Sequence, residues 1–319
     1  WQFKNLKRSF KSFFQQIINP RGDSSPSGSL SPFFLMETAA MLQTKLYTGS
    51  DFPELLDETS GKFIKLPEKF SLEGFEPSQN PMVPMVHKDY VFTKSLFRDV
   101  ALFLARPHGH ALWLAGPTGS GKTSVITELA GRLNYPVYSI TCNSRMEFDD
   151  LVGRPMVISK PGEQPSVKFI YGPLARAMKS GGILLLNEVD LCDPAQLSGL
   201  NDVLEGRPLT ITQNGGEQIQ PHPMFRVVVT ANSAGNGDET GSYTGVLSQN
   251  VAAMDRYRLM RVDYLSEGIE TVLLKKLFSN ISSQILTGLV RCANKIRKSY
   301  IEGELTAPMS TRCLCFWTE

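Results

Sequence analysis

The sequence is poor in the residues that build disulfide frameworks and metal centres. It contains five cysteines, an odd number without regular spacing, which excludes a disulfide framework and favours a reducing compartment, the cytoplasm. Its four histidines are not spaced as metal ligands, and Cys313 and Cys315 lack a second cysteine or histidine pair at a suitable spacing. We therefore expect a cytoplasmic protein without a cysteine–histidine metal site.

Long apolar runs and net charge are also lacking. No stretch of 18 apolar residues occurs, so we expect no transmembrane helix. The 33 basic and 31 acidic residues leave a formal net charge of +2, which favours no particular partner for the chain as a whole. The chain begins with Trp1 instead of methionine, which leaves its targeting unassigned.

Residues 1–19 are an exception to this even charge, because they carry basic residues and no acidic one. A stripe of apolar residues recurs there at helical spacing: Phe3, Leu6, Phe10, Phe13 and Ile17. A basic amphipathic helix of this kind binds a membrane surface, an acidic groove or nucleic acid, or packs on its own protein or a sister subunit. The pattern leaves these alternatives open.

Residues 20–86 are interpreted as a linker and an N-terminal appendage. The segment 20–32 is rich in Pro, Gly and Ser, as flexible linkers are. We expect a short helix over residues 36–46 and a loop over residues 67–84.

Residues 87–265 alternate predicted strands with predicted helices. Strands are expected at 111–115, 137–141, 183–187 and 226–231, and helices at 91–104 and 123–133. This alternation predicts an α/β fold, a parallel sheet with helices on both faces. Residues 266–319 then form a small α-helical lid, with helices expected at 267–278, at 281–300 and from Ser310 onward.

A glycine-rich loop follows the first core strand and matches the pattern G-x-x-x-x-G-K-[ST]. The order of strand, loop and helix is the one in which backbone N–H groups and a helix N-terminus converge on nucleotide phosphates. Lys122 would contact the β- and γ-phosphates, and the Thr123 hydroxyl would bind Mg²⁺. We expect ATP to bind through Gly116, Pro117, Thr118, Gly119, Ser120, Gly121, Lys122, Thr123 and Ser124.

The buried strand at 183–187 ends in a second group of candidate residues, Asn187 and Glu188. In phosphate-loop ATPases the acid at a strand end binds Mg²⁺ or its water, and the next acid polarises the attacking water. Asn187 is a neutral, weaker ligand that would contact the metal through water. Glu188 keeps the water-activating position, which predicts an active ATPase; Asp190 is a nearby acid without an assigned role.

Three further polar residues follow in order. Asn232 directly follows the strand at 226–231, where an amide can orient the attacking water. Arg256 belongs to an Asp-Arg pair, and an arginine presented across a subunit boundary can stabilise charge on the γ-phosphoryl group. Arg312 stands at the start of the last predicted helix. Glu188, Asn232, Arg256 and Arg312 are the candidate catalytic residues.

This ordered set resembles an AAA+ ATPase, and over residues 88–319 it resembles the CobS subunits of aerobic cobaltochelatase. The segments that carry the resemblance are 221–226, 230–233, 237–243 and 254–256, with 150–153 and 309–312. CobS belongs to the MoxR branch of AAA+ proteins. The resemblance implies a hexameric ring, a partner with a von Willebrand factor A domain, and roles for Asn232 as sensor 1, Arg256 as a finger acting on a neighbour's ATP and Arg312 as sensor 2.

The family also implies an inserted β-hairpin, which fits residues 152–172. The turn sequence Asn214-Gly215-Gly216 predicts a second hairpin over residues 209–220, and both would face the ring pore or the partner. Three features depart from CobS. Asn187 replaces an Asp, the first 85 or so residues have no counterpart, and the chain ends at Glu319, where CobS continues with further helices. The last feature predicts a lid that is incomplete or is completed from outside this chain.

The predicted function is an ATP-hydrolysing ring motor. In the CobS case it drives cobalt insertion into a corrin ring by a separate large chelatase subunit. The alternative is a MoxR-type chaperone that acts with a von Willebrand factor A partner on a client unrelated to cobalamin. A nucleic-acid motor has only the basic segment 1–19 in its favour, so no nucleic acid is expected, and a nucleotide-gated scaffold has only Asn187.

Overall fold

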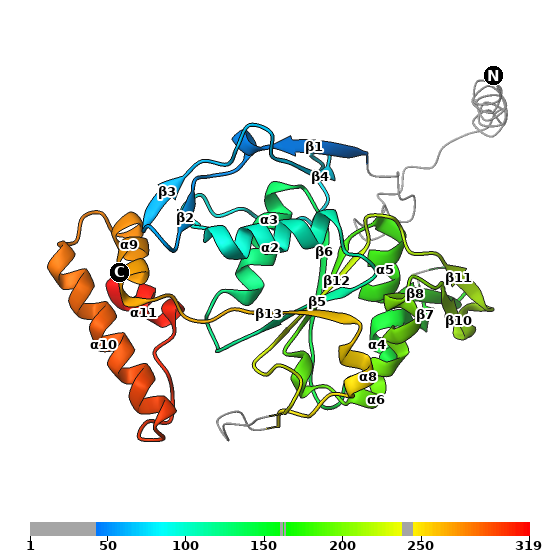
Figure 1. The fold of residues 1–319 in the computed structure, drawn as a ribbon. Helices are drawn as coiled ribbons and strands as arrows, with labels where there is room; N and C mark the ends of the chain where they lie inside the picture. Colours follow the sequence, from blue (N-terminus) through cyan, green and yellow to red (C-terminus); the bar gives the residue numbers. More distant parts are fainter. Residues whose placement is uncertain (1–42, 160–161, 163, 238–244) are drawn as a thin grey trace. The chain divides into compact units, whose positions relative to one another are not determined.

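The computed structural model describes residues 43–159, 162, 164–237 and 245–319. Within them, one parallel sheet has the strand order β13-β5-β12-β9-β6 (Figure 1). Its strands are β5 (Ala111–Ala115), β6 (Val137–Thr141), β9 (Ile183–Asn187), β12 (Arg226–Ala231) and β13 (Tyr257–Arg261). The predicted parallel sheet is confirmed, together with the four strands expected from the sequence.

Both faces of this sheet are buried, because alternate residues of its strands enter two different apolar clusters. Trp113 of β5 belongs to one cluster and Leu112 and Leu114 to the other. The helices in this part of the chain are α2 (Lys94–Ala105), α3 (Lys122–Arg132), α4 (Phe148–Val152), α5 (Pro173–Ser180), η3 (Val189–Leu191), α6 (Pro194–Leu197), η4 (Ser198–Leu200), α7 (Asn201–Leu204) and α8 (Val251–Met254). Helices on both faces were predicted, and α2 and α3 begin and end within a few residues of the expected bounds.

Strand β13 was not expected from the sequence. Arg258 and Arg261 interrupt its apolar residues, so the segment lacks the continuous apolar run of a central strand. It lies at the edge of the sheet and pairs only with β5, from Tyr257 opposite Ala111 to Arg261 opposite Ala115. An edge strand keeps one side open to solvent and therefore tolerates charged residues.

Residues 43–86 differ from the expectation of helix and loop. Leu46, placed in a predicted helix over 36–46, lies in strand β1, and strand β4 crosses the predicted loop over 67–84. The strands are β1 (Thr44–Thr48), β2 (Leu55–Asp57), β3 (Lys62–Ile64) and β4 (Ser71–Phe75), with η2 at Gly49–Asp51. β1 pairs with β4 and β2 with β3, both antiparallel. The helix prediction was wrong at residues 44–46 and the loop prediction at residues 71–75, because apolar residues such as Tyr47 and Phe75 pack into the same cluster as α2 and α3.

The C-terminal helices are α9 (Glu267–Leu277), α10 (Ser283–Ile301) and α11 (Thr311–Thr318). They enclose a small apolar cluster of their own around Leu274, Leu286, Val290 and Leu314. The predicted helical lid is confirmed. No helix in the described ranges is long and apolar enough to span a bilayer.

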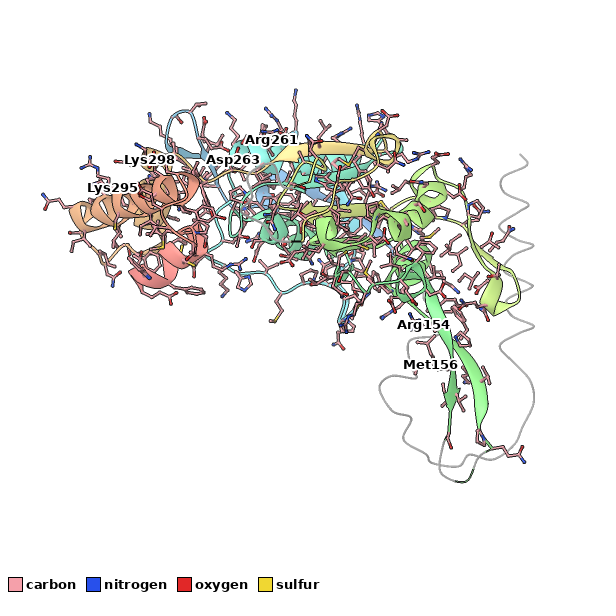
Figure 2. The ribbon with its side chains drawn as sticks, turned by 90° about the horizontal axis from the view of Figure 1, so that it is seen from below. Arg154, Met156, Arg261, Asp263, Lys295 and Lys298 are labelled. Atoms are coloured by element: carbon pink, nitrogen blue, oxygen red, sulfur yellow. The ribbon has the colours of Figure 1, made fainter. Side chains whose placement is uncertain are left out.

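The structure contains both expected hairpins. One consists of β7 (Gly153–Ile158) and β8 (Ser166–Tyr171), and the other of β10 (Leu209–Ile211) and β11 (Glu217–Ile219), with η5 (Thr212–Asn214) at its turn. The β7–β8 hairpin extends away from the sheet and helices, with Arg154 near its base and Met156 further along it (Figure 2). Met156, Val157, Val167 and Ile170 are exposed on it. The predicted helix over residues 1–19 and the linker over 20–32 lie outside the described residues.

Candidate active site

The glycine-rich loop connects β5 to α3 and lies against two other parts of the chain. A Cβ atom on Gly116 would meet the Val262 carbonyl oxygen at 2.2 Å, and one on Gly119 would meet Ser310 Cβ at 2.5 Å. Gly119 also has a φ of +71°, a conformation that favours glycine. The loop therefore needs glycine both for its turn and for its contacts with the end of β13 and the start of α11.

Lys122 begins helix α3 and bends back over the loop. Its Nζ donates hydrogen bonds to the carbonyl oxygens of Gly116 at 2.6 Å and Pro117 at 2.9 Å. Burial lowers the pKa of Lys122 to about 8, an effect that the nearby Arg312 reinforces and that Asp190 and Glu188 oppose. A half-buried cation beside the backbone of the loop is suited to bind an anionic phosphate.

Thr123 and Asn187 meet across the ends of α3 and β9. The Thr123 hydroxyl donates to Asn187 Oδ1 at 2.9 Å, and the Thr230 hydroxyl donates to the same oxygen at 3.2 Å. Asn187 Nδ2 donates to Ser139 Oγ at 2.9 Å. The amide of Asn187 thus links β9 to α3, β12 and β6 and presents an oxygen beside the Thr123 hydroxyl.

These two oxygens fit a hard divalent cation such as Mg²⁺, which takes oxygen ligands. Both Thr123 Oγ1 and Asn187 Oδ1 are neutral. The nearby carboxylates of Glu188 and Asp190 act electrostatically on Lys122. With Thr123 as a neutral ligand and Asn187 in contact with the ion through water, the protein would leave most of the coordination of Mg²⁺ to nucleotide phosphates and water.

Glu188 and Asn232 face the same cavity as the loop. This cavity of about 270 Å³ is lined by Thr118, Gly119, Gly121, Lys122, Thr123, Ser124, Thr141, Asn187, Glu188, Thr230, Ala231, Asn232 and Arg312. Glu188 follows β9 in a left-handed backbone conformation with a φ of +55°, which is uncommon for a residue other than glycine. Such strained residues concentrate at functional sites.

Asp190 holds the end of β12 in place, a role that the sequence did not reveal. Its side chain is fully buried, and Oδ2 accepts the backbone N–H of Asn232 at 2.8 Å and of Ser233 at 3.2 Å. Its position two residues after Glu188 was visible in the sequence, but its partner across the sheet edge was not. Asp190 thereby fixes Asn232 relative to Glu188.

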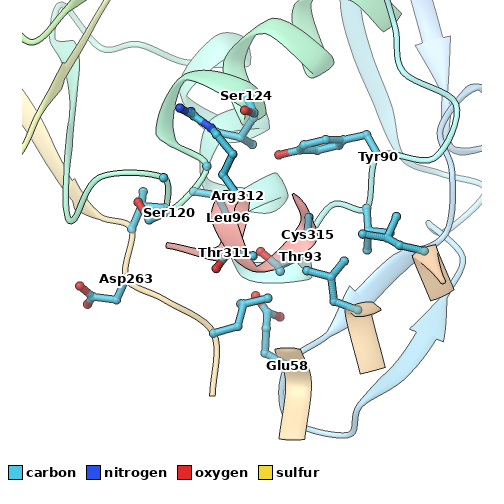
Figure 3. A pocket seen from close by; sticks show the side chains of 18 of the residues that line it. Glu58, Tyr90, Thr93, Leu96, Ser120, Ser124, Asp263, Thr311, Arg312 and Cys315 are labelled. Carbon is cyan, nitrogen blue, oxygen red and sulfur yellow. The ribbon is translucent and has the colours of Figure 1, made fainter. Parts of the chain in front are cut away.

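A second cavity of about 650 Å³ adjoins the other side of the loop (Figure 3). Ser120, Ser124 and Arg312 border it, together with Tyr90 and Thr93 from the segment before α2. Glu58, from the turn after β2, also lines this cavity and accepts the backbone N–H of Ser95. Gly119, Gly121, Ser124 and Arg312 line both cavities, so the two form adjoining spaces on either side of the loop.

Arg312 and Arg256 occupy opposite ends of the sheet. Arg312 lines both cavities from the start of α11. Arg256 directly precedes β13, and its backbone carbonyl accepts the N–H of Ala111 at the beginning of β5. The loop follows the other end of β5, about 16 Å away at 3.3 Å per residue. Of the four candidate catalytic residues, the structure brings Glu188, Asn232 and Arg312 together and leaves Arg256 apart.

The family model of the AAA domain (dynein-related subfamily) matches residues 111–244. The chain is 30% identical to the aerobic cobaltochelatase subunit CobS of a Sinorhizobium species over 242 residues, which are 74% of this chain and 72% of that protein. It is 28% identical over 226 residues to an uncharacterized protein of Staphylococcus epidermidis, covering 70% and 81% of the two chains. A solved RuvB mutant of Thermotoga maritima, at 16% identity and a TM-score of 0.42, covers 70% of this chain and 67% of that chain.

Proposed function

The chain belongs to the AAA+ ATPase family that contains CobS, and from this membership we propose that it is a ring motor that hydrolyses ATP to remodel a partner complex. The observation that supports the proposal most strongly is the cavity in which the phosphate loop, Glu188, Asn232 and Arg312 meet. A nucleotide-binding loop alone would explain affinity for ATP. A carboxylate, an amide and an arginine around the same space add the groups that hydrolysis requires.

In the proposed reaction, Lys122 and the backbone N–H groups of the loop bind the phosphates. Mg²⁺, held by Thr123 and through water by Asn187, would neutralise charge on the phosphate oxygens. Glu188 accepts a proton from the attacking water, and Asn232 orients that water. Arg312 stabilises charge on the γ-phosphoryl group from the side of the lid.

Arg256 completes the proposal as a residue that acts on a neighbouring subunit. Within one chain it lies at the amino end of β13, at the opposite end of the sheet from the loop. An arginine that stabilises the transition state must lie close to the γ-phosphoryl group, so Arg256 requires the ATP of another copy. This favours a ring, which we propose to be a hexamer.

We propose the client of the motor from the same family membership. In the CobS version, the motor works with a large chelatase subunit and drives cobalt insertion into a corrin ring. A second candidate, a MoxR-type chaperone with a von Willebrand factor A partner, is favoured by residues 43–86, which form strands that precede the region of resemblance to CobS. The five cysteines are all free, which suits the cytoplasm, where we place the protein.

The test is Mg²⁺-dependent ATP turnover by the assembled protein. We expect turnover in the wild type and a loss of at least about a hundredfold in Glu188→Gln, because the amide cannot accept the proton of the attacking water. ATP binding should persist in this variant. Glu73→Gln, an exposed carboxylate in β4, is the matched control and should keep full activity.

A wild-type ring that turns over no more ATP than Glu188→Gln would refute the proposed ATPase. Affinity purification with Glu188→Gln in the presence of ATP then separates the two client hypotheses. Recovery of a large chelatase subunit supports the CobS version, and recovery of a von Willebrand factor A protein without one supports the chaperone.

A further inference from the structure

The helical lid contains a buried pair of opposite charges. Arg297 of α10 donates to both carboxylate oxygens of Glu270 in α9, from NH1 to Oε2 at 2.7 Å and from NH2 to Oε1 at 2.8 Å. The two side chains are 7% and 0% exposed. A bidentate pair of this kind fixes both the distance and the plane of the two groups. It therefore holds α9 and α10 in one relative position.

The same two side chains also fix the start of α11. Arg297 Nε donates to the backbone carbonyl of Met309 at 2.7 Å, and the Thr311 hydroxyl donates to Glu270 Oε1 at 2.7 Å. Arg312 is the next residue after Thr311 and lines both cavities. The buried pair thus determines where the backbone of Arg312 lies.

On its other side, the pair is connected to the phosphate loop. The Arg297 guanidinium lies over the Tyr264 ring, 4.2 Å from its centre. The Tyr264 hydroxyl donates to the backbone carbonyl of Thr118 at 2.7 Å. Tyr264 belongs to the segment between β13 and α9, where the chain passes from the sheet to the lid. The loop is therefore bonded to the lid through this connecting segment.

We propose that Tyr264, Arg297, Glu270 and Thr311 form a positioning relay that couples the conformation of the phosphate loop to the position of Arg312. This inference rests on the proposed ATP turnover and extends it. Phosphate binding changes the conformation of the loop at the Thr118 carbonyl. The relay transmits this change to the start of α11. None of the four residues is required to touch the nucleotide, so each acts through Arg312.

The test is a double-mutant cycle between Tyr264 and Arg312, with kcat and KM for ATP as readouts. Tyr264→Phe removes only the hydroxyl that bonds the Thr118 carbonyl. A single hydrogen bond of this kind corresponds to about a three- to tenfold change, which we expect in kcat with little change in KM. In an Arg312→Ala background, the same substitution should change kcat less than about twofold, because the group that the relay positions is gone.

Two further comparisons separate positioning from general stability. Thr311→Val should reproduce the loss of kcat, and Thr311→Ser, which keeps the hydroxyl, should restore most of it. Tyr47→Phe is the matched control, because the Tyr47 hydroxyl also donates to a backbone carbonyl, that of Phe75, at 2.8 Å. It can lower the melting temperature and should leave kcat unchanged.

Equal losses of kcat for Tyr264→Phe with and without Arg312 would overturn the relay and leave the ATPase intact. So would a wild-type value of kcat in Tyr264→Phe. A wild-type protein that does not turn over ATP would refute the proposed function, and the relay with it. The two failures are distinguished by the activity of the wild type.

Discussion

Two of the arginine–glutamate ion pairs in the described part of the chain differ in burial. Arg297 and Glu270 lie within the lid with 7% and 0% of their side chains exposed, whereas Arg256 and Glu205 lie near the amino end of β13 with 29% and 33% exposed. Arg297 also contacts Met309, Asn294 and Tyr264 in the lid and its connecting segment, and Glu270 accepts a further hydrogen bond from Thr311. Arg256 adds one bond, to the Ala252 carbonyl at 2.7 Å.

The two pairs differ in the free-energy cost of removing one partner. Two buried charges have lost their hydration, so removing one partner leaves the other uncompensated. A pair near the surface exchanges its partner for water at little cost. Hydrogen bonds from Arg256 and Arg207 lower the pKa of Glu205. Arg297 therefore stabilises the fold, whereas Arg256 can leave Glu205 and bind a second ligand.

The largest expected effect is on turnover, from Arg256→Ala. If Arg256 acts on the ATP of a neighbour, its loss should lower kcat by about a thousandfold or more, the usual contribution of such an arginine. The midpoint of urea unfolding should be unchanged, because the pair is exposed. Turnover by the assembled protein and chemical denaturation measure the two quantities.

Arg207→Ala is the matched control, because Arg207 also pairs with Glu205 and lies on the surface. It should keep wild-type turnover. Mixing Arg256→Ala with Lys122→Ala subunits should restore part of the activity, since some interfaces then combine an intact arginine with an intact loop. An absence of recovery in confirmed mixed assemblies would contradict a role for Arg256 across the interface.

The next largest effect is on stability, from Arg297→Met. Removal of the guanidinium leaves Glu270 buried without its main partner, which should lower the free energy of unfolding by about 3–5 kcal/mol. Urea denaturation measures this. Arg291→Met is the control in the same helix, because Arg291 pairs with the exposed Glu267.

The double variant Arg297→Met/Glu270→Met should recover most of the lost stability, since no charge then remains buried. If Arg297→Met and Arg291→Met were equally stable, the contrast between a buried and an exposed pair would not hold.

The smallest effect concerns Lys122, a half-buried cation that donates to two carbonyl groups. Its pKa of about 8 means that the free protein loses this charge as the pH rises above 8. Binding a phosphate there then requires uptake of a proton, so the affinity for ATP should fall by up to about tenfold per pH unit above 8. Titration calorimetry from pH 7 to 9.5 measures it. Lys122→Arg, which stays charged, should show a flat profile, and a parallel fall in both proteins would contradict the assignment.

The sequence predicted the parts of the site that a local pattern defines. Glycine spacing predicted the phosphate loop. Continuous or periodic apolar residues predicted the lid helices and the strands that lead to Asn187 and Asn232. Strand β13 and the strands of residues 43–75 were missed because edge strands and small hairpins carry charged residues among their apolar ones. Where these strands form depends on the surface against which they pack.

The relay could not be predicted for a different reason. Thr118, Tyr264, Glu270, Arg297 and Thr311 span nearly two hundred positions, and their contacts exist only after the lid has folded against the loop. No spacing in the sequence marks them. Asp190 is similar, since its partners Asn232 and Ser233 lie on another strand.

Strand β13 has one property that matters once copies of the chain stand side by side. Val262, which directly follows its far end, lies against Gly116 of the chain's own loop, and Arg256 directly precedes its near end. Because β13 is hydrogen-bonded to β5 along its length, we expect it to move as one unit. In the proposed ring, a shift that begins at the nucleotide of one subunit would therefore reach the next subunit as a displaced Arg256.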